Sequence, residues 1–182
     1  MEYPVIEGEL VTLKRVDEST TPLLHEHLQV RKFYREIGRR HIPTVKELND
    51  DLFDDQMLFV WQVYLGEEER HVGYAGFVAY SGPPYIFYFS LELPVEYEIA
   101  QDCFQELVPL FFRDSEEPLL YTYVEKPVSE QLDELLVEGG FDALESVPAI
   151  DNNAIAVYAM ERHTYEAYYG DEDDDETEEL EF

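Results

Sequence analysis

The chain has 182 residues, of which 42 are acidic and 12 are basic, so its formal net charge is −30. Such an excess of negative charge argues against direct binding to nucleic acid or to anionic membranes, because both are themselves negatively charged. Hydrophobic residues make up 45% of the sequence, which fits one domain with a sizeable core and excludes a wholly disordered chain.

The N-terminal part of the chain predicts one strand followed by two helices. Residues 9–16 alternate between the two faces expected of a strand. Thr21 and Pro22 predict a helix, with Thr21 as its N-cap and Pro22 at the first helical position. Thr44 and Glu47 have the spacing of a capping box and predict the start of a second helix.

Five of the twelve basic residues lie between these two helix starts: Arg31, Lys32, Arg35, Arg39 and Arg40. Two interpretations of this basic cluster stay open. The cluster pairs with the acidic surface of the protein itself, or it cradles an anionic group of a ligand.

The middle of the chain predicts three strands and then a long helix. The strands cover residues 57–65, 72–80 and 85–93, and Pro94 ends the third because proline has no N–H to donate. After Pro94 the apolar residues follow a helical period and share one face: Ile99, Cys103, Phe104, Leu107, Leu110 and Phe111. Pro109 is expected to end or kink this helix. A strand that runs into a helix N-terminus is a common place to bind an anionic group.

The C-terminal part predicts three more strands around one helix. The strands cover residues 119–124, 143–147 and 154–160, and the helix is capped by Ser129 and closed by a Gly-Gly pair. The tyrosine-rich residues 163–169 remain unassigned. The predicted order is β-α-α-β-β-β-α-β-α-β-β in one domain over residues 1–170. We therefore expect an α+β fold: a mixed, mostly antiparallel central sheet with helices on both faces.

The last twelve residues, 171–182, carry nine acidic side chains and no basic one, so we expect a disordered, solvated tail. Subtracting these nine charges from −30 leaves −21 for residues 1–170. Three interpretations fit so acidic a body: a basic protein partner, mimicry of nucleic acid, or adaptation to high salt. The aromatic content of 14% favours the basic partner over salt adaptation. The oligomeric state is left open.

The remaining reactive residue types predict no metal site and no nucleophile. Cys103 is the only cysteine, lies on the apolar helix face and is expected to be buried and inert. His25 and His27 lie two residues apart and therefore point to different faces of their helix. The other three histidines have no close cysteine or histidine partner in the sequence. With no apolar run of membrane-spanning length and no signal-peptide pattern, a soluble cytoplasmic protein is the default expectation.

Four short motifs resemble a known family in their order and spacing. They are the opening Gly8–Arg15 (GELVTLKR) with Gly38-Arg39-Arg40 after a helix, then Val72–Phe77 (VGYAGF), Ile99–Phe104 (IAQDCF) and Gly139–Phe141 (GGF). Together they resemble the GNAT N-acetyltransferase superfamily over about residues 7–162. The most similar branch acetylates ribosomal-protein N-termini and small amines.

The resemblance implies an acetyl-CoA site in the middle of the chain. In that fold the central strand and the next strand splay apart, so residues 91–95 are expected at the opening, and Glu92 becomes the candidate catalytic base. Tyr121 and Tyr123 lie outside the region where the family often places a tyrosine acid, so that role is unassigned. Ser129 stands where the branch carries an asparagine. If CoA binds, the resemblance gives five cofactor-binding residues: Leu93, Val95, Tyr97, Ile99 and Ala100.

The sequence departs from the family at the loop that binds the pyrophosphate. The family pattern there is (Arg or Gln)-x-x-Gly-x-(Gly or Ala), and glycine lets the backbone approach the anion. With Ala100 aligned to the family's alanine, Glu96 and Glu98 occupy the two glycine positions. Two unit charges about 4 Å apart repel by roughly 4 kcal/mol at an effective dielectric constant of about 20. That repulsion corresponds to a loss of about 10³-fold in affinity.

Two hypotheses for the function follow. In the first, the chain is a GNAT-fold protein with lost or weakened acetyl-CoA binding that acts as an acidic protein-binding module. In the second, it is an active GNAT N-acetyltransferase that transfers acetyl from acetyl-CoA to an amine or a protein N-terminus. The pyrophosphate loop favours the first hypothesis, and the fold resemblance favours the second.

Overall fold

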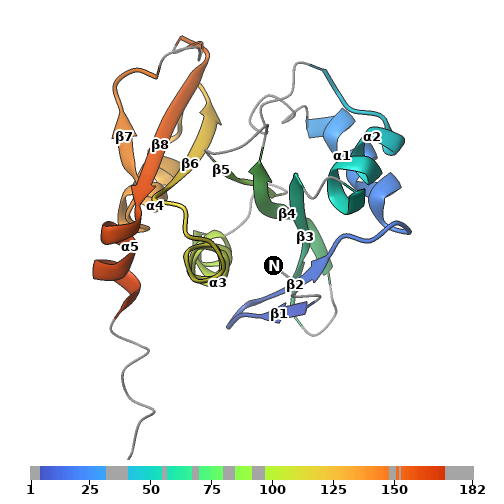
Figure 1. Ribbon diagram of the computed structural model, residues 1–182, viewed down its shortest axis with the longest axis horizontal. Helices are drawn as coiled ribbons and strands as arrows, with labels where there is room; N and C mark the ends of the chain where they lie inside the picture. The colour runs from blue at the N-terminus through green and yellow to red at the C-terminus, as the bar shows by residue number, and fades with distance from the viewer. Residues whose placement is uncertain are drawn as a thin grey trace, which may run out of the picture.

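The computed structural model describes residues 5–31, 41–54, 57–66, 70–79, 85–91, 97–147, 151 and 153–170. Eight strands form one sheet in the order β1-β2-β3-β4-β5-β6-β8-β7 (Figure 1). Every neighbouring pair is antiparallel except β5 and β6, which are parallel, so the predicted mixed and mostly antiparallel sheet is confirmed. The strands are β1 (Val5–Glu7), β2 (Val11–Arg15), β3 (Leu58–Leu65), β4 (Arg70–Ala79), β5 (Tyr85–Leu91), β6 (Leu119–Glu125), β7 (Asp142–Leu144) and β8 (Ile155–Glu161).

Successive residues of the central strands enter two different hydrophobic cores, one on each face of the sheet. On β3, Val60 belongs to one core and Trp61 to the other, as the two-residue period of a strand requires. Gly76 lies opposite Val60, where the two backbones come so close that a Cβ atom on Gly76 would lie 1.9 Å from the Phe59 carbonyl oxygen. Glycine is therefore needed at this position for β3 and β4 to pair.

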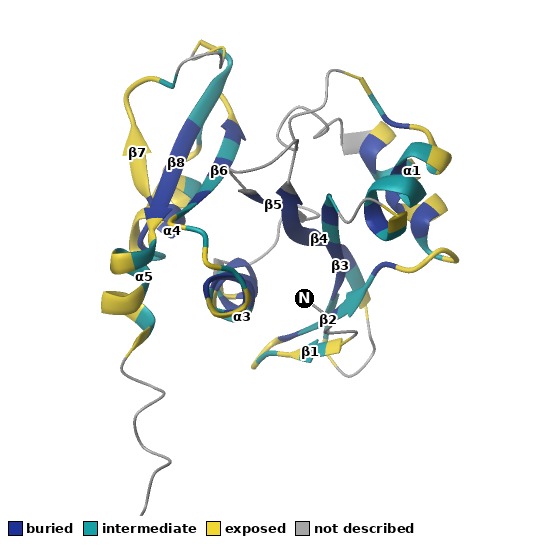
Figure 2. Ribbon diagram, viewed as in Figure 1, coloured by how far each residue is buried: buried dark blue, intermediate teal, exposed yellow. Residues whose placement is uncertain are grey.

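Helices cover both faces of the sheet, as predicted (Figure 2). On one face lie α1 (Thr21–Arg31), α2 (Val45–Asn49) and the short π-helix η2 (Asp50–Asp54), which contribute the buried Leu24, Leu28, Leu48 and Leu52. On the other face lie α3 (Tyr97–Asp114), α4 (Glu130–Glu138) and α5 (Arg162–Tyr169). The six apolar α3 residues named from the helical period are all buried in the hydrophobic core that contains Trp61.

The parallel strands β5 and β6 part after a short contact. β5 pairs with β4 along its whole length, up to Leu91. With β6 it pairs only at Tyr85, Ile86 and Phe87. In Figure 1 the halves of the sheet diverge from this point, and α3 is seen almost end-on between them. The expected splay is thus confirmed as far as Leu91, the last described residue of the strand.

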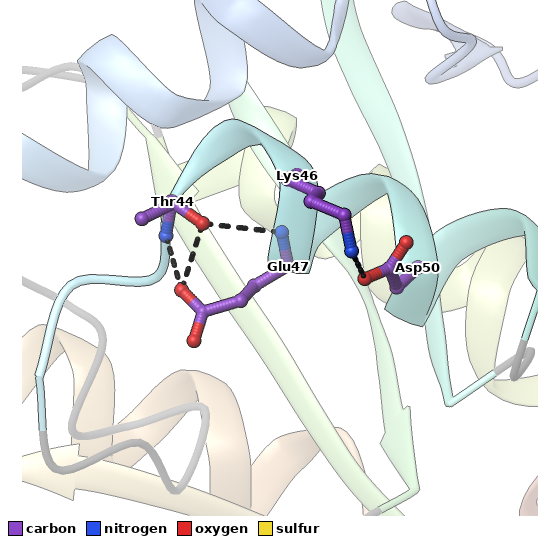
Figure 3. Close-up of polar contacts among 4 residues, drawn as sticks. All are labelled: Thr44, Lys46, Glu47 and Asp50. Atoms are coloured by element: carbon purple, nitrogen blue, oxygen red, sulfur yellow. Dashed lines mark hydrogen bonds and ion pairs between the residues drawn. The ribbon is translucent and has the colours of Figure 1, made fainter.

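The predicted capping box at the start of α2 is confirmed (Figure 3). The Thr44 hydroxyl accepts a hydrogen bond from the Glu47 N–H at 3.2 Å, and the Glu47 carboxylate accepts one from the Thr44 N–H at 2.7 Å. Lys46 and Asp50, one helical turn apart, form an ion pair of 2.9 Å. Ser129 likewise caps α4 by accepting from the Leu132 N–H at 3.2 Å, as expected.

The predicted start of one helix is wrong, and of the two outcomes expected at Pro109, an end or a kink, the end is wrong. Thr21 is the first residue of α1 rather than its N-cap, since its hydroxyl donates to the Asp17 carbonyl and the Thr20 carbonyl accepts from the Leu24 N–H. Pro109 does not end α3, which continues to Asp114. Beyond Pro109, Leu110, Phe111 and Phe112 are all buried. Their burial outweighs the one backbone hydrogen bond that the proline removes.

The observed order contains elements that the sequence did not predict. β1 precedes the expected first strand, and the unassigned tyrosine-rich segment forms α5. β7 is shorter than predicted and covers only Asp142–Leu144. None of the helices in the described ranges combines the length and apolar composition needed to span a lipid bilayer. The acidic segment 171–182 lies outside the described residues, and the single-domain boundary stays a prediction.

Candidate functional site

The predicted cofactor site lies where β5 leaves β6 and α3 begins. Glu92, Leu93 and Val95 fall in the segment 92–96, outside the described residues. Tyr97 is described only as the first residue of α3. The structure therefore leaves the proposed catalytic role of Glu92, and the contacts of these four residues, as predictions.

Ile99 and Ala100 are the two predicted cofactor-binding residues whose side chains are described. Their exposed fractions are 5% and 9%, and both belong to the hydrophobic core beneath α3. Their side chains are thus committed to packing. Only their backbone N–H groups, in the first turn of α3, are left to serve an anionic ligand.

The first turn of α3 carries an exposed acidic side chain, Glu98. A carboxylate at a helix N-terminus interacts favourably with the positive end of the helix dipole. The same carboxylate repels any phosphate that approaches these N–H groups. The start of α3 therefore provides, on its described residues, a poor match to a pyrophosphate.

A buried carboxylate that the sequence did not single out lies one turn further along α3. Asp102 is 5% exposed and accepts hydrogen bonds from the backbone N–H groups of Glu9 at 3.2 Å, Leu10 at 2.7 Å and Val11 at 2.8 Å. Glu9 and Leu10 lie in the turn between β1 and β2, and Val11 is the first residue of β2. A Cβ atom on Gly8 would lie only 2.7 Å from the Asp102 carboxylate, so glycine leaves room for this contact. Asp102 thereby ties the N-terminal hairpin to α3.

The sequence did contain one signal for this contact. Asp102 lies between Ile99 and Cys103 on the apolar stripe of the helix, where an acid must find partners once it is buried. The partners themselves are more than ninety residues away in the chain. No helical period or local spacing could have identified them.

Two further ionisable groups of α3 are perturbed by burial. Burial, followed by the nearby Asp102, raises the pKa of the Cys103 thiol to about 12. The thiol is therefore protonated at neutral pH and inert, as the sequence predicted. Burial, again with Asp102 as the second cause, also raises the pKa of Glu106.

The tyrosines near the C-terminal half of the sheet do not supply an obvious acid. Tyr121 and Tyr123 lie on β6, and burial raises the pKa of Tyr123. Tyr158 on β8, which the sequence did not single out, donates its hydroxyl to Asp133 at 2.6 Å. Burial, and then this hydrogen bond, raise the pKa of Tyr158 to about 12. Ser129, at the position of the family's asparagine, is occupied as the N-cap of α4.

The basic cluster between the first two helices lies almost wholly outside the described residues. Lys32, Arg35, Arg39 and Arg40 are not described, and Arg31 is described only as the last residue of α1. Both interpretations of the basic cluster, pairing with the protein's own acidic surface and binding an anionic group of a ligand, therefore stay open.

Comparisons with known proteins give a clear result for the fold. No protein-family model and no curated protein matches this chain. Solved structures do match it, with most of both chains covered. A putative GNAT-family acetyltransferase from Bordetella pertussis has a TM-score of 0.63 at 13% identity, over 87% of this chain and 99% of that one. This chain has the GNAT acetyltransferase fold.

Two other similar structures contain coenzyme A. The ribosomal L7/L12 α-N-protein acetyltransferase RimL, in complex with coenzyme A, has a TM-score of 0.60 at 13% identity over 86% of this chain and 97% of that one. The aminoglycoside acetyltransferase AAC(6′)-Ib, in complex with ribostamycin and coenzyme A, has a TM-score of 0.64 at 18% identity, over 87% of this chain and 97% of that one. At such low identities the GNAT fold is shown, and the activity has to be argued from the site.

The Asp102 contact predicts a specific loss of stability. Asp102→Asn replaces one carboxylate oxygen with an NH2 group, which cannot accept a hydrogen bond, so at least one backbone N–H that Asp102 now binds is left unpaired. We expect the free energy of unfolding to fall by about 1.5–3 kcal/mol, measured by urea denaturation. Glu106→Gln, one turn along the helix, is the matched control. Because burial already disfavours the charged form of Glu106, this change is expected not to lower stability. Equal losses in both variants would contradict the assigned role of Asp102.

The raised pKa of Cys103 predicts both its reactivity and a pH effect. Iodoacetamide is expected to modify the thiol at pH 8 only in unfolded protein. In the unfolded chain the thiol ionises near its ordinary pKa of 9.0, while in the folded chain its pKa is about 12. The thiol's contribution to stability is therefore complete below pH 9 and declines as the pH rises towards 12.

Cys103→Ala is expected to remove this part of the pH dependence, measured by urea denaturation at pH 7.5 and 9.5. Rapid modification of the native protein at pH 8 would show that the thiol is accessible and ionised.

Proposed function

We propose that this chain is a GNAT-fold protein with lost or weakened acetyl-CoA binding that acts as an acidic protein-binding module. The single observation that carries the proposal is the exposed Glu98 in the first turn of α3, where the fold would present N–H groups to a pyrophosphate. Glu96 places a second carboxylate two residues earlier in the sequence. Both occupy positions that the family pattern gives to glycine.

The described residues do not fit the cofactor that the fold implies. The side chains of Ile99 and Ala100 are buried in the core, and Glu98 opposes an anion at the N–H groups that remain. We therefore assign no catalytic step through acetyl-CoA. A cytoplasmic location is part of the same proposal and rests on the single, buried cysteine.

The protein-binding part of the proposal rests on the charge of the body. Residues 1–170 carry −21 after the tail is set aside, and the acids are dense on some elements. The nine-residue helix α4 has four acidic residues and no basic one: Glu130, Asp133, Glu134 and Glu138. All four are exposed. A surface of this kind attracts a basic protein partner and speeds its association at low salt.

The alternative function, an active N-acetyltransferase, has one observation in its favour. The described parts of β5 and β6 separate after Phe87, and similar folds bind coenzyme A. The opening that the family uses for its cofactor is thus retained in the strands. The two proposals differ in whether the start of α3 accepts the cofactor.

A calorimetric titration distinguishes these proposals. We expect millimolar acetyl-CoA to give no measurable heat of binding with the unmodified protein at moderate salt. The double variant Glu96→Gly, Glu98→Gly should gain measurable affinity, because it removes both the repulsion and the obstruction of the backbone. The matched pair Glu96→Gln, Glu98→Gln removes the charge alone and should gain less.

A second control, Glu130→Gln with Glu134→Gln, removes the same amount of charge from α4 and should gain no affinity for acetyl-CoA. Tight binding by the unmodified protein would show that the alignment or the charge argument is wrong.

The basic-partner proposal predicts a specific response to salt. Exposed charges are screened beyond roughly 8–10 Å at physiological ionic strength, so capture of a partner should weaken steeply as salt rises. Adaptation to high salt predicts instead that the fold itself becomes steadily more stable up to molar salt. A pull-down and a thermal melt at the same series of salt concentrations separate the two. A pull-down that recovers nothing at low salt, with a melting temperature that climbs into molar salt, would favour the halophile interpretation.

A further inference from the structure

A small pocket opens on the surface where α3, α4 and α5 meet. Its volume is about 170 Å³. Small-molecule sites usually occupy about 300–1,000 Å³, so the pocket is closer in size to one side chain than to a cofactor. Its lining consists of Gln101, Phe104, Gln105, Leu135, Glu138, Gly139, Tyr168 and Tyr169.

The two α5 tyrosines that line the pocket, Tyr168 and Tyr169, have different environments. The Tyr169 ring stacks on Tyr165, with centroids 5.5 Å apart, and its hydroxyl donates to the Gly139 carbonyl at 3.4 Å. Tyr168 lies against Gly140, where an added Cβ atom would meet its ring at 3.6 Å, yet Tyr168 is 60% exposed. The Tyr169 ring is thus held in the pocket lining by its contacts, whereas the Tyr168 ring is largely open to solvent.

The polar groups of the lining match a cation. The lining contains the carboxylate of Glu138, the amide groups of Gln101 and Gln105, which include acceptor oxygens, and two tyrosine rings, whose π faces attract cations. No lining residue carries a positive charge. An anionic ligand would meet repulsion here, whereas a lysine or arginine side chain would find partners for both its charge and its aliphatic stem.

We propose that this pocket, lined by the two α5 tyrosines and Glu138, receives one lysine or arginine side chain of a partner protein. The proposal rests on the proposed function, because it names the group of a basic partner that the acidic surface would recognise. The general negative charge brings the partner near, and the pocket selects one of its basic residues.

The test uses amide-resonance NMR of the full chain with defined probes. Nα-acetyl-arginine amide and Nα-acetyl-lysine amide are titrated, with Nα-acetyl-norleucine amide as the neutral control of similar shape. We expect saturable shifts at the pocket residues with the two cationic probes and none with the neutral one.

Three variants then locate the binding. Tyr168→Ala removes an exposed ring and Glu138→Gln removes one charge, and each is expected to weaken binding by about two- to fivefold. Glu134→Gln removes the same charge from the same helix outside the pocket and should weaken binding clearly less than Glu138→Gln, because it lowers only the general negative charge. Equal weakening by Glu134→Gln and Glu138→Gln would overturn the pocket, because it would show attraction to the general charge alone.

A short peptide of alternating lysine and glycine separates failure of the pocket from failure of the proposed function. Binding that is salt-dependent and weaker in the Tyr168 and Glu138 variants supports the pocket. Equal binding to the unmodified protein and all three variants overturns the pocket and leaves the acidic binding module standing. Absence of binding to every version at low salt contradicts both. Saturable shifts of the same residues by acetyl-CoA would assign the pocket to the cofactor and overturn the proposal.

Discussion

The packing of α3 against the divided sheet is the interaction on which the rest of this structure depends. β5 and β6 share only three paired positions, so backbone pairing joins the two halves of the sheet weakly. Phe104 bridges them, since its ring lies 4.9 Å from Phe87 of β5 and 5.9 Å from Phe141, which precedes β7. Phe111 adds a contact of 5.2 Å to Phe77 of β4. The strands can separate because the helix holds both halves in one core.

Polar contacts hold both ends of the same helix. Near its start, the Asp102 carboxylate binds three backbone N–H groups in and directly after the β1–β2 turn. At its end, the Arg162 guanidinium donates to the carbonyls of Phe112, Ser115 and Glu117. Carbonyls at a helix C-terminus lack partners within the helix, and a positive charge there also suits the dipole. These contacts connect α3 to the first and last elements of the chain, β1–β2 and α5.

Local patterns in the sequence predicted much of this arrangement. The helical period of α3, the capping box at Thr44 and the cap at Ser129 each depend on neighbours within a few residues, and each is confirmed. The features that were missed depend on distant partners. α5 is tyrosine-rich and has no strong local signal. Its Tyr165 ring stacks on Phe112 of α3, and its Tyr169 ring stacks on Tyr165. Pro109 does not end α3, which was one of the two outcomes expected there, because burial of the residues beyond it favours a helix that continues to Asp114.

The sequence predicted a place for the candidate site but only some of its residues and contacts. The order of motifs predicted it where the central strand runs into α3. The parting of β5 and β6 confirms the expected splay of the strands up to Leu91, and the site itself stays a prediction. Its chemistry depends on Glu96 and Glu98 at positions where the family pattern carries glycine. Of these two, only Glu98 lies among the described residues, exposed in the first turn of α3, so the role of the carboxylates at this position remains part of the proposal.

The most direct test of this account is a thermal melt with about 1 mM acetyl-CoA, because a ligand that binds the native state must raise its melting temperature. The account predicts no change beyond about 1 °C. A dissociation constant of about 10 μM would stabilise the fold by about 2.7 kcal/mol at that concentration. For a chain of this length the melting temperature would then rise by about 5 °C or more. Such a rise would contradict the loss of cofactor binding and favour the acetyltransferase.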